Sequence, residues 1–290
     1  MENRINGHTK LFCLIGSPVG HSGSPAMYNY SFDKLKIDSA YLAFDIPLEK
    51  TAEAVEALRL LHVGGFNITM PCKTAVSQCV DELSPAARMI GACNTVTVGA
   101  DGKLTGHNTD GIGFVRNLSK HGVSIKGKKL VVLGAGGAAT ALTIQSALDG
   151  AAQIRIFNRK GFNFYANAER TVEKIKANIP GCDVSVEDLL NSDALAAAAN
   201  ACDILVNATK VGMAPLDKQT LIDPKLFRPE MVVADTVYNP KETRMIQEAK
   251  AAGCTVVGGI GMLLQQGVAA FNLFTGENMP EEEVMQKFFS

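Results

Sequence analysis

Short apolar runs alternate with longer segments of mixed polarity in the first quarter of the chain. The apolar runs lie at 11–15, 41–46 and 65–68, and the segments at 25–36 and 49–61 fall between them. Apolar runs of this length, bounded by glycine or polar residues, are typical of buried strands, whereas the longer segments are typical of helices. The pattern predicts a β-α-β-α-β series.

A second series of the same kind begins at Lys128. Its expected strands are 130–133, 154–157, 204–207, 232–235 and 255–257, separated by segments long enough for helices. Alternating strands and helices produce parallel sheets that helices cover on both faces. The predicted fold class is therefore α/β, with a mainly parallel sheet in the first series and a doubly wound sheet in the second.

The polar stretch 108–113 separates the two series, and we expect a helix from about 111 to 121. An uncharged segment from Gly261 onward is expected to form a helix that returns to the first domain. The predicted domains are 1–110 together with about 261–290, and 111–260. The length of 290 residues agrees with two domains at roughly 150 residues each, although length alone also allows one large barrel.

Composition and charge exclude several functional classes. Lys and Arg total 28 against 29 Asp and Glu, so the net charge of -1 disfavours nucleic acid and anionic membranes as partners. Two uncharged stretches, 130–148 and 251–276, are long enough to cross a membrane, but they contain three and six glycines and several amide side chains. We therefore expect turns and helices of a soluble protein there.

The seven cysteines include no C-x-x-C pair, and an odd number fits neither a disulfide framework nor a zinc site. We expect reduced core thiols and no bound metal. The apolar run 11–15 is too short for the core of a signal peptide, so a cytoplasmic location is expected.

A glycine-rich turn follows the expected strand 130–133. Gly134-Ala135-Gly136-Gly137-Ala138-Ala139 has the pattern G-x-G-x-x-A between a strand and a helix. The first glycine permits the tight turn, the second admits a pyrophosphate close to the backbone, and the small third position allows the helix to pack on the strand. The helix N-terminus then offers N–H groups to the phosphates. This context favours a dinucleotide site over an ordinary turn.

Asn158-Arg159-Lys160 stands where NAD-binding domains usually carry an acid after the second strand, and no acid follows until Glu169. Two cations suit the 2'-phosphate of NADP, but solvated cations at a strand end explain them equally well. The residues leave the choice between NAD and NADP open.

Four polar clusters interrupt the strands of the first domain and its exit. They are 21–25 (HSGSP), 67–73 (NITMPCK), 91–95 (GACNT) and 108–110 (NTD). Strand ends in parallel sheets form ligand crevices, so these clusters are candidates to converge on one polar molecule. Each alone has a structural alternative as a helix cap, a turn residue or a solvated lysine.

Nine ordered motifs extend over almost the whole chain. They are His21-Ser-Gly-Ser-Pro25, Asn67-x-Thr-x-Pro-x-Lys73, Gly91-Ala-Cys-Asn-Thr95, Asn108-Thr-Asp110, Gly134-Ala-Gly-Gly-Ala138, Asn158-Arg159, Asn207-Ala-Thr209 with Gly212-Met213, Asp235-x-x-Tyr238, and Gly261-Met-Leu263 with Gln266. Together they resemble the shikimate dehydrogenase family, including its quinate/shikimate dehydrogenase branch. The resemblance implies an N-terminal substrate domain completed by the C-terminal helix, and a Rossmann-type domain for NAD or NADP.

The resemblance also implies a role for each matching residue. Ser22 and Ser24, helped by Tyr238 and Thr69, would bind the substrate carboxylate. Asn94, Asp110 and Gln266 would bind ring hydroxyls, and Lys73 with Asp110 would stand at the oxidised alcohol as catalytic residues. The implied cofactor residues are Gly134, Ala135, Gly136, Gly137 and Ala138 at the pyrophosphate, Asn158, Arg159 and Lys160 at the adenosine ribose, and Thr209, Lys210, Met213, Gly259 and Met262 around the nicotinamide.

Two departures from the family pattern concern specificity. NAD-preferring relatives tend to carry an acid just after the Asn-Arg pair, where this chain has Gly161, yet the aromatic stretch 162–165 is more similar to the quinate/shikimate branch. Gln265 stands where that branch often has Trp, which leaves quinate as a substrate open. The preference between NAD and NADP stays open as well.

The implied reaction interconverts shikimate and 3-dehydroshikimate, a step toward chorismate and the aromatic amino acids. Burial favours a neutral Lys73 amine and an adjacent aspartate favours the ammonium; we expect the ammonium, which stabilises a developing alkoxide. A dehydrogenase for quinate or another cyclic hydroxy acid is the first alternative. A ligand sensor without catalysis is the second, although such a sensor would be expected to lack Lys73 or Asp110. A monomer and a homodimer are both compatible with the sequence.

Overall fold

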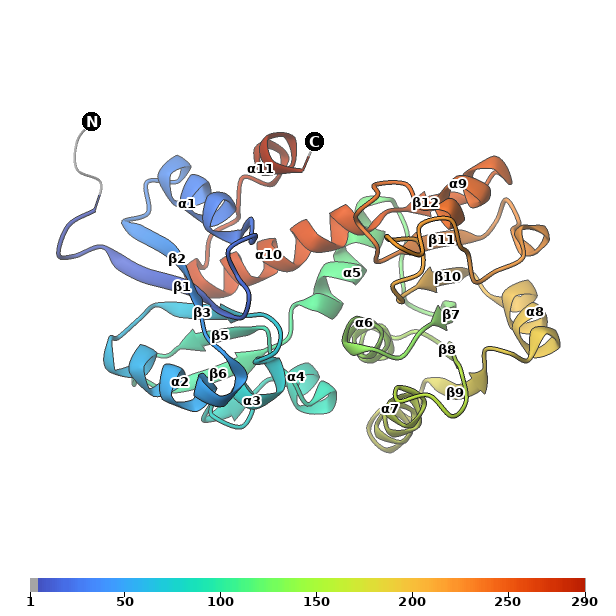
Figure 1. Ribbon diagram of the computed structural model, residues 1–290, viewed down its shortest axis with the longest axis horizontal. Coiled ribbons are helices and arrows are strands. Elements are labelled where there is room, and N and C mark those ends of the chain that lie inside the picture. Colours follow the sequence, from blue (N-terminus) through green and yellow to red (C-terminus); the bar gives the residue numbers. More distant parts are fainter. Residues whose placement is uncertain (1–4, 290) are drawn as a thin grey trace. The chain divides into compact units, whose positions relative to one another are not determined.

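The computed structural model describes residues 5–289, and the chain divides into two compact units. The first unit comprises Met1–Thr109 and Gln266–Ser290, and the second comprises Asp110–Gln265. Figure 1 labels the helices and strands of both units. Each unit contains one six-stranded sheet.

The sheet of the first unit has the order β2-β1-β3-β5-β6-β4. Its strands are β1 (Lys10–Gly16), β2 (Ser39–Asp45), β3 (Gly65–Ile68), β4 (Glu82–Leu83), β5 (Thr95–Val98) and β6 (Leu104–His107). The expected parallel strands β1, β2 and β3 are confirmed, since β1 pairs in parallel with both others. The expected strands did not include β5 and β6, which run antiparallel to each other because only residues 99–103 connect them. A parallel crossover needs a dozen or more residues.

Helices cover both faces of this sheet. They are α1 (Ser24–Lys34), the short 3-10 helix η1 (Leu48–Lys50), α2 (Thr51–Leu60), α3 (Lys73–Val76), α4 (Pro85–Ile90), the C-terminal part of α10 (Gly259–Thr275) and α11 (Glu281–Phe288). On one face the ring of Phe12 lies 5.5 Å from Phe32 of α1 and 5.1 Å from Phe274 of α10. On the other face Ile15 joins a buried cluster with Val55 of α2. Alternate residues of β1 therefore serve two cores.

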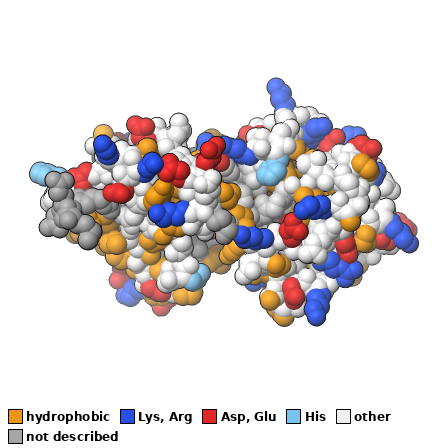
Figure 2. Space-filling model, turned by 90° about the horizontal axis from the view of Figure 1, so that it is seen from above, with side chains coloured by type: hydrophobic (Ala, Val, Ile, Leu, Met, Phe, Trp, Pro, Cys, Tyr) orange, Lys and Arg blue, Asp and Glu red, His pale blue; other side chains and the backbone are white. Residues whose placement is uncertain are grey.

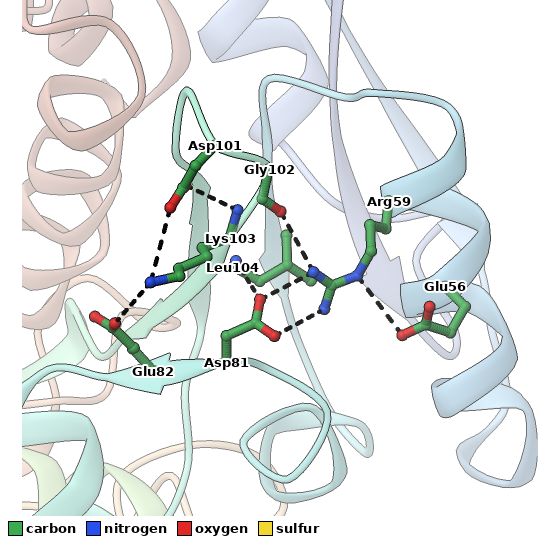
Figure 3. Close-up of polar contacts among 8 residues, drawn as sticks. All are labelled: Glu56, Arg59, Asp81, Glu82, Asp101, Gly102, Lys103 and Leu104. Atoms are coloured by element: carbon green, nitrogen blue, oxygen red, sulfur yellow. Dashed lines mark hydrogen bonds and ion pairs between the residues drawn. The ribbon is translucent and has the colours of Figure 1, made fainter.

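A surface network of ion pairs and hydrogen bonds ties α2 to the β5–β6 turn (Figure 3). Asp81 accepts hydrogen bonds from the backbone N–H of Leu104 at 2.7 Å and from Arg59 of α2 at 2.9 Å. Arg59 also donates to the carbonyl of Gly102. The Arg59 guanidinium and the Leu104 N–H lower the pKa of the Asp81 carboxyl. Asp81 thus anchors the hairpin as an ionised group.

The sheet of the second unit is entirely parallel, with the order β12-β11-β10-β7-β8-β9. Its strands are β7 (Lys129–Leu133), β8 (Gln153–Asn158), β9 (Asp183–Asp188), β10 (Ile204–Asn207), β11 (Val232–Asp235) and β12 (Thr255–Val257). This is the doubly wound order of dinucleotide-binding domains, with the switch point between β7 and β10. The predicted Rossmann-type fold is confirmed. The predicted strands did not include β9, an edge strand whose sequence DVSVED has only two apolar residues.

The helices of the second unit are α5 (Asp110–Lys120), α6 (Gly137–Leu148), α7 (Tyr165–Asn178), α8 (Ser192–Ala201), the 3-10 helix η2 (Pro224–Leu226), α9 (Arg244–Ala251) and the start of α10. The final helix was expected from Gly261, but it begins at Gly259. The carbonyl of Gly258 accepts a hydrogen bond from Asn117 of α5 at 3.0 Å, and a side chain at Gly261 would overlap Asn117. Glycine is therefore required by close packing inside the helix rather than by a turn.

Within residues 5–289, no helix is long and apolar enough to cross a membrane. Lys, Arg, Asp and Glu side chains are interspersed over the face that Figure 2 presents, in keeping with the net charge of -1.

Candidate active site

The segments that follow β1 and β3 and the segment that precedes β5 lie at one edge of the first sheet. The segment after β3 is bonded to the end of β1, because Thr69 N–H donates to the Ile15 carbonyl at 2.9 Å and Ser17 N–H donates to the Met70 carbonyl at 3.0 Å. Gly16, at φ 148°, has no space for a Cβ, which would overlap the Thr69 methyl group. The predicted residue Thr69 thus lies against the end of β1.

Lys73 opens α3, a helix of only four residues. Its carbonyl accepts the backbone N–H of Cys93 at 3.1 Å, and the carbonyl of Asn94 accepts the N–H of Ile68 at 2.8 Å. The structure therefore brings the segments of Thr69, Lys73 and Asn94 together, although they are separated by up to 25 positions in the chain. The antiparallel direction of β5 places its first residues at this edge.

Asn94 is buried, and its side chain accepts three hydrogen bonds. Its Oδ1 accepts the Thr109 N–H at 2.8 Å and the hydroxyls of Thr109 and Thr95 at 3.1 Å. Asn67 accepts the Tyr41 hydroxyl at 2.8 Å and donates to Thr95 at 2.9 Å. Asn67 is thus a structural member of its motif, and Asn94 fixes the residue that directly precedes Asp110.

Ser22 and Ser24 stand at the start of α1, after the segment that follows β1. The predicted alternative of a side-chain cap is only partly met: Ser22 Oγ accepts the Ser24 N–H at 3.3 Å, but the N-cap position is Gly23, which has no side chain to cap with. Pro25 occupies the first turn, as expected of a helix start. Gln266 is the first residue of the C-terminal part of this unit.

The glycine turn of the second unit fits a dinucleotide. Gly134 has φ 115°, and a Cβ there would lie 2.7 Å from the Ala208 carbonyl oxygen. At Gly136 and Gly137, in contrast, a Cβ would have no neighbouring atom within 4 Å. Gly136 caps α6 without a side chain, and Asn167 of α7 holds the Ala135 carbonyl at 2.7 Å. The turn combines a fixed backbone with open space at a helix N-terminus, as phosphate binding requires.

The end of β8 carries Asn158, Arg159 and Lys160. Asn158 Nδ2 is buried and has no hydrogen-bond partner among residues 5–289, which suits a donor to a ligand such as the adenosine ribose. The Arg159 guanidinium lies over the Phe162 ring, 4.1 Å from its centroid. This cation–π contact holds the side chain within its own loop.

Asp188 is an acid at this strand end that the sequence motifs did not reveal. It pairs in register with Asn158, and its Oδ1 accepts the Lys160 N–H at 3.2 Å. Backbone N–H groups of Leu190 and Lys160 lower its pKa. Along the chain no acid follows the Asn-Arg pair before Glu169, but in the folded sheet Asp188 lies beside it. Asp188 comes from β9, an unpredicted strand, and no local motif marked it.

The loops after β10 and β11 are held by a buried carboxylate. Thr209 donates to Asn207 Oδ1 at 2.7 Å, and Asn207 Nδ2 donates to Asp235 Oδ1 at 3.0 Å. Burial raises the pKa of Asp235 to about 6, although hydrogen bonds from Thr243, Val237 and Asn207 act in the opposite direction. These loops carry Lys210, which is exposed, and Met213 and Tyr238, which are 36% and 52% exposed.

Gly259, at the start of α10, packs against the loop after β11. A Cβ there would lie 2.5 Å from the carbonyl oxygen of Val237. Met262 follows one turn later on the same helix and is partly exposed.

The predicted residues divide between the two units. The first unit contains Ser22, Ser24, Thr69, Lys73, Asn94 and Gln266; the second contains Asp110, Tyr238 and the predicted cofactor residues. No group of three or more His, Cys, Asp or Glu residues among those described is placed to hold a metal ion.

The fold and these strand ends define an α/β protein with a Rossmann-type dinucleotide-binding unit and a second, polar-edged α/β unit. Two family models match the chain: the shikimate dehydrogenase substrate binding domain over residues 14–96, and the shikimate 5'-dehydrogenase C-terminal domain over residues 259–287. The chain is 47% identical to a shikimate dehydrogenase (NADP(+)) of Streptococcus uberis, over 100% of this chain and 99% of that protein. The chain belongs to the shikimate dehydrogenase family.

Solved structures agree with this assignment. A shikimate 5-dehydrogenase from Listeria monocytogenes, in complex with shikimate and NAD, is 44% identical with a TM-score of 0.96, covering 100% of this chain and 99% of that one. A quinate dehydrogenase from Corynebacterium glutamicum, in complex with NAD, is 30% identical with a TM-score of 0.84, covering 97% and 98%. Both similarities extend over the two units.

Proposed function

We propose that this protein is an oxidoreductase that interconverts shikimate and 3-dehydroshikimate with NAD or NADP. The observation that carries the proposal is the segment 69–73, whose backbone is bonded both to the end of β1 and to Cys93 beside Asn94. This arrangement gathers hydroxyl, ammonium and amide groups at one sheet edge. The relative from Listeria monocytogenes, whose structure contains shikimate and NAD, supports the same reaction class.

Each polar residue has a role in binding the substrate. Ser22, Ser24, Thr69 and Tyr238 donate hydroxyl hydrogen bonds to the substrate carboxylate, and several converging donors suffice for an anion away from water. Asn94, Asp110 and Gln266 bind the ring hydroxyls. Because Asn94 Oδ1 already accepts from Thr109, its amide group is held in one orientation before substrate binds.

Lys73 acts on the oxygen of the reacting carbon. As an ammonium it stabilises the alkoxide that develops during reduction and then donates its proton to that oxygen; in oxidation the amine accepts the proton. Asp110 orients Lys73. The nicotinamide, when bound, accepts or supplies the hydride. The Cys93 N–H donates to the Lys73 carbonyl at the start of α3, so the backbone that carries the ammonium is fixed.

The dinucleotide is held by three groups of residues. Gly134 to Ala138 bind the pyrophosphate, Asn158 to Lys160 bind the adenosine ribose, and Thr209, Lys210, Met213, Gly259 and Met262 surround the nicotinamide. Arg159 and Lys160 favour a 2'-phosphate, whereas Asp188 beside Lys160 opposes it. Opposite charges at one strand end support use of both NAD and NADP.

Quinate is the second candidate substrate, because the chain is similar over both units to a quinate dehydrogenase. The proposal places the reaction in the cytoplasm, in chorismate and aromatic amino acid biosynthesis, as the work of a monomer or a homodimer.

The test is absorbance of the reduced nicotinamide with purified protein, supplied with shikimate or quinate and with NAD or NADP in all four combinations. The expected result is reduction of the nicotinamide in the mixtures that contain shikimate. The ratio of the rates with NAD and NADP measures the balance between the two cations and Asp188. If the protein were active with quinate and inactive with shikimate, quinate would be assigned as its substrate. A folded protein silent in all four mixtures would contradict the proposal.

A further inference from the structure

Asp235, the last residue of β11, is the centre of a buried network that the reaction described above does not use. The residue is 4% exposed, and its side chain accepts three hydrogen bonds. Asn207 Nδ2 donates to Oδ1 at 3.0 Å, Val237 N–H donates to Oδ1 at 2.9 Å, and the Thr243 hydroxyl donates to Oδ2 at 2.6 Å. The donors come from the end of β10, the loop after β11 and the N-cap of α9.

The network links two loops at the carboxyl edge of the second sheet, where β10, β11 and β12 lie side by side (Figure 1). Asn207 also donates to the Val211 carbonyl at 2.9 Å, so its amide group connects the loop 208–213 to Asp235. A Cβ on Gly212 would lie 2.9 Å from the Thr243 methyl group, which shows that this loop touches the residue bonded to Asp235. The two loops are thus fixed to each other through one carboxylate.

These same loops carry residues that the proposed function assigns to the nicotinamide and the substrate. Thr209, Lys210 and Met213 lie on the loop after β10, and Tyr238 lies three residues beyond Asp235. A displacement of the network would move both sets of side chains, whereas the end of β8, which pairs with β7 and β9, would keep its own contacts. The adenosine half of the dinucleotide would therefore still bind.

Stability alone is a poor reason for a carboxylate at this place. A buried charge must be stripped of water, and an apolar side chain of similar volume often packs as well or better. What the carboxylate adds is three acceptor directions that fix three donors at once. Geometry rather than stability is the property that this network provides.

We propose that Asp235 is a positioning residue for hydride transfer, which through Asn207 and Thr243 holds the loops 208–213 and 236–243 in the geometry that aligns the nicotinamide with the substrate. This inference rests on the proposed function. Asp235 touches neither reacting group, and its effect passes entirely through the loops.

The experiment compares Asp235→Ala, Asp235→Asn and Asp203→Ala in the full chain. Asn keeps the carbonyl acceptor for Val237 and Asn207, and its amide faces the Thr243 oxygen. Asp203 is the control: it accepts the Lys129 N–H at 2.8 Å and pairs with Lys128, but it directly precedes β10, at the opposite edge of the same sheet. For each variant we would measure kcat, the KM of both substrates, the dinucleotide Kd and the Tm.

Asp235→Ala is expected to lower kcat by about 30-fold or more while the dinucleotide Kd stays within about 3-fold, because a misplaced reacting group costs rate more than binding. Asp235→Asn is expected to recover kcat to within about 3-fold of the wild type. Asp203→Ala is expected to lower the Tm and leave kcat unchanged. An unchanged kcat in Asp235→Ala, or an equal loss of kcat in Asp203→Ala, would overturn the proposal.

Two further measurements keep the outcomes distinct. If Asp235→Ala does not fold, Thr243→Val removes one donor of the network, and an unaltered kcat in that variant would overturn the proposal. If the wild type turns over none of the four substrate and cofactor mixtures, the proposed function fails. The fluorescence of bound NADH then reports the environment that the loops form around the nicotinamide, and it needs no turnover. An emission spectrum that is the same in wild type and Asp235→Asn but altered in Asp235→Ala then supports the positioning role; identical spectra in all three reject it.

Discussion

A buried asparagine stands at the carboxyl edge of each sheet, yet its partners differ between the two units. In the first unit Asn67 bonds the Tyr41 and Thr95 hydroxyls, so the network consists of neutral groups. In the second unit Asn207 bonds the Asp235 carboxylate. The first network therefore keeps its hydrogen bonds across the pH range in which carboxyl groups titrate, whereas the second is coupled to a proton.

The two networks also differ in the segments that they join. The first sheet turns antiparallel at β5, so hydroxyls and amides from β3 and β5 face each other across a strand pair. The second sheet is parallel throughout, and its strand ends are followed by separate loops. Asn207 and Asp235 also face each other across a strand pair, but the carboxylate has further acceptor positions, which bond Val237 in the following loop and Thr243 at the start of α9.

The largest effect is expected at the polar edge of the first sheet. Lys73→Ala should lower kcat by about 100-fold or more, because the ammonium acts chiefly on the developing alkoxide, and should change the KM for shikimate only modestly. Steady-state kinetics in both directions measures it, with circular dichroism as the control for folding. A rise in KM at constant kcat would make Lys73 a binding residue instead.

The next prediction concerns the proton coupled to the second network. Burial raises the pKa of Asp235 from 3.8 to about 6, so the folded state takes up this proton before the unfolded state does. The contribution of this group to the free energy of unfolding should therefore increase as the pH falls from above 6 toward 4, by up to roughly 3 kcal/mol from the size of the shift. Urea unfolding of wild type and Asp235→Asn at several pH values measures the difference. Parallel pH profiles would contradict the coupling.

Removing the neutral network should cost stability without such a pH dependence. Asn67→Leu leaves the buried Tyr41 hydroxyl without its acceptor and removes one hydrogen bond of the Thr95 hydroxyl, which should lower the free energy of unfolding by about 2 kcal/mol. The loss should be the same at pH values near 5 and near 8, since none of these groups titrates there. A loss that depends on pH would show that the Asn67 network is also coupled to a titrating group, which would contradict the comparison.

The smallest effect is expected at the surface network of the first unit. The Arg59 and Asp81 side chains are 32% and 39% exposed, so Asp81→Asn should cost less than about 1 kcal/mol. Because the pKa of Asp81 is lowered in the folded state, its contribution is present above the unfolded value of 3.8 and is lost as the pH falls through the folded value. This sign is opposite to that of Asp235. Thermal unfolding of the two proteins at pH values near 3 and near 7 checks it, and an equal difference at both pH values would exclude the ion pair as the cause.

The parallel strands were predicted most closely. β10, β11 and β12 have the residue limits expected from the sequence. β10 and β11 are almost fully buried, and such strands are continuous apolar runs. β9 was missed because every second residue of DVSVED is polar or charged, and such an edge strand lacks that signal. The hairpin of β5 and β6 was missed because its strands are part of, or adjoin, polar motifs that are typical of ligand-binding loops.

The two α/β series, the glycine turn at 134–138 and the polar motifs could all be predicted from the sequence, since each depends on neighbours within a few positions along the chain. Only the tertiary structure placed Asp188 beside Lys160 and bonded Asp235 to Asn207. In both cases, strands adjacent in the sheet bring together residues 28 positions apart in the chain. A hydrogen bond depends on distance in space, and strand pairing in the folded sheet sets that distance.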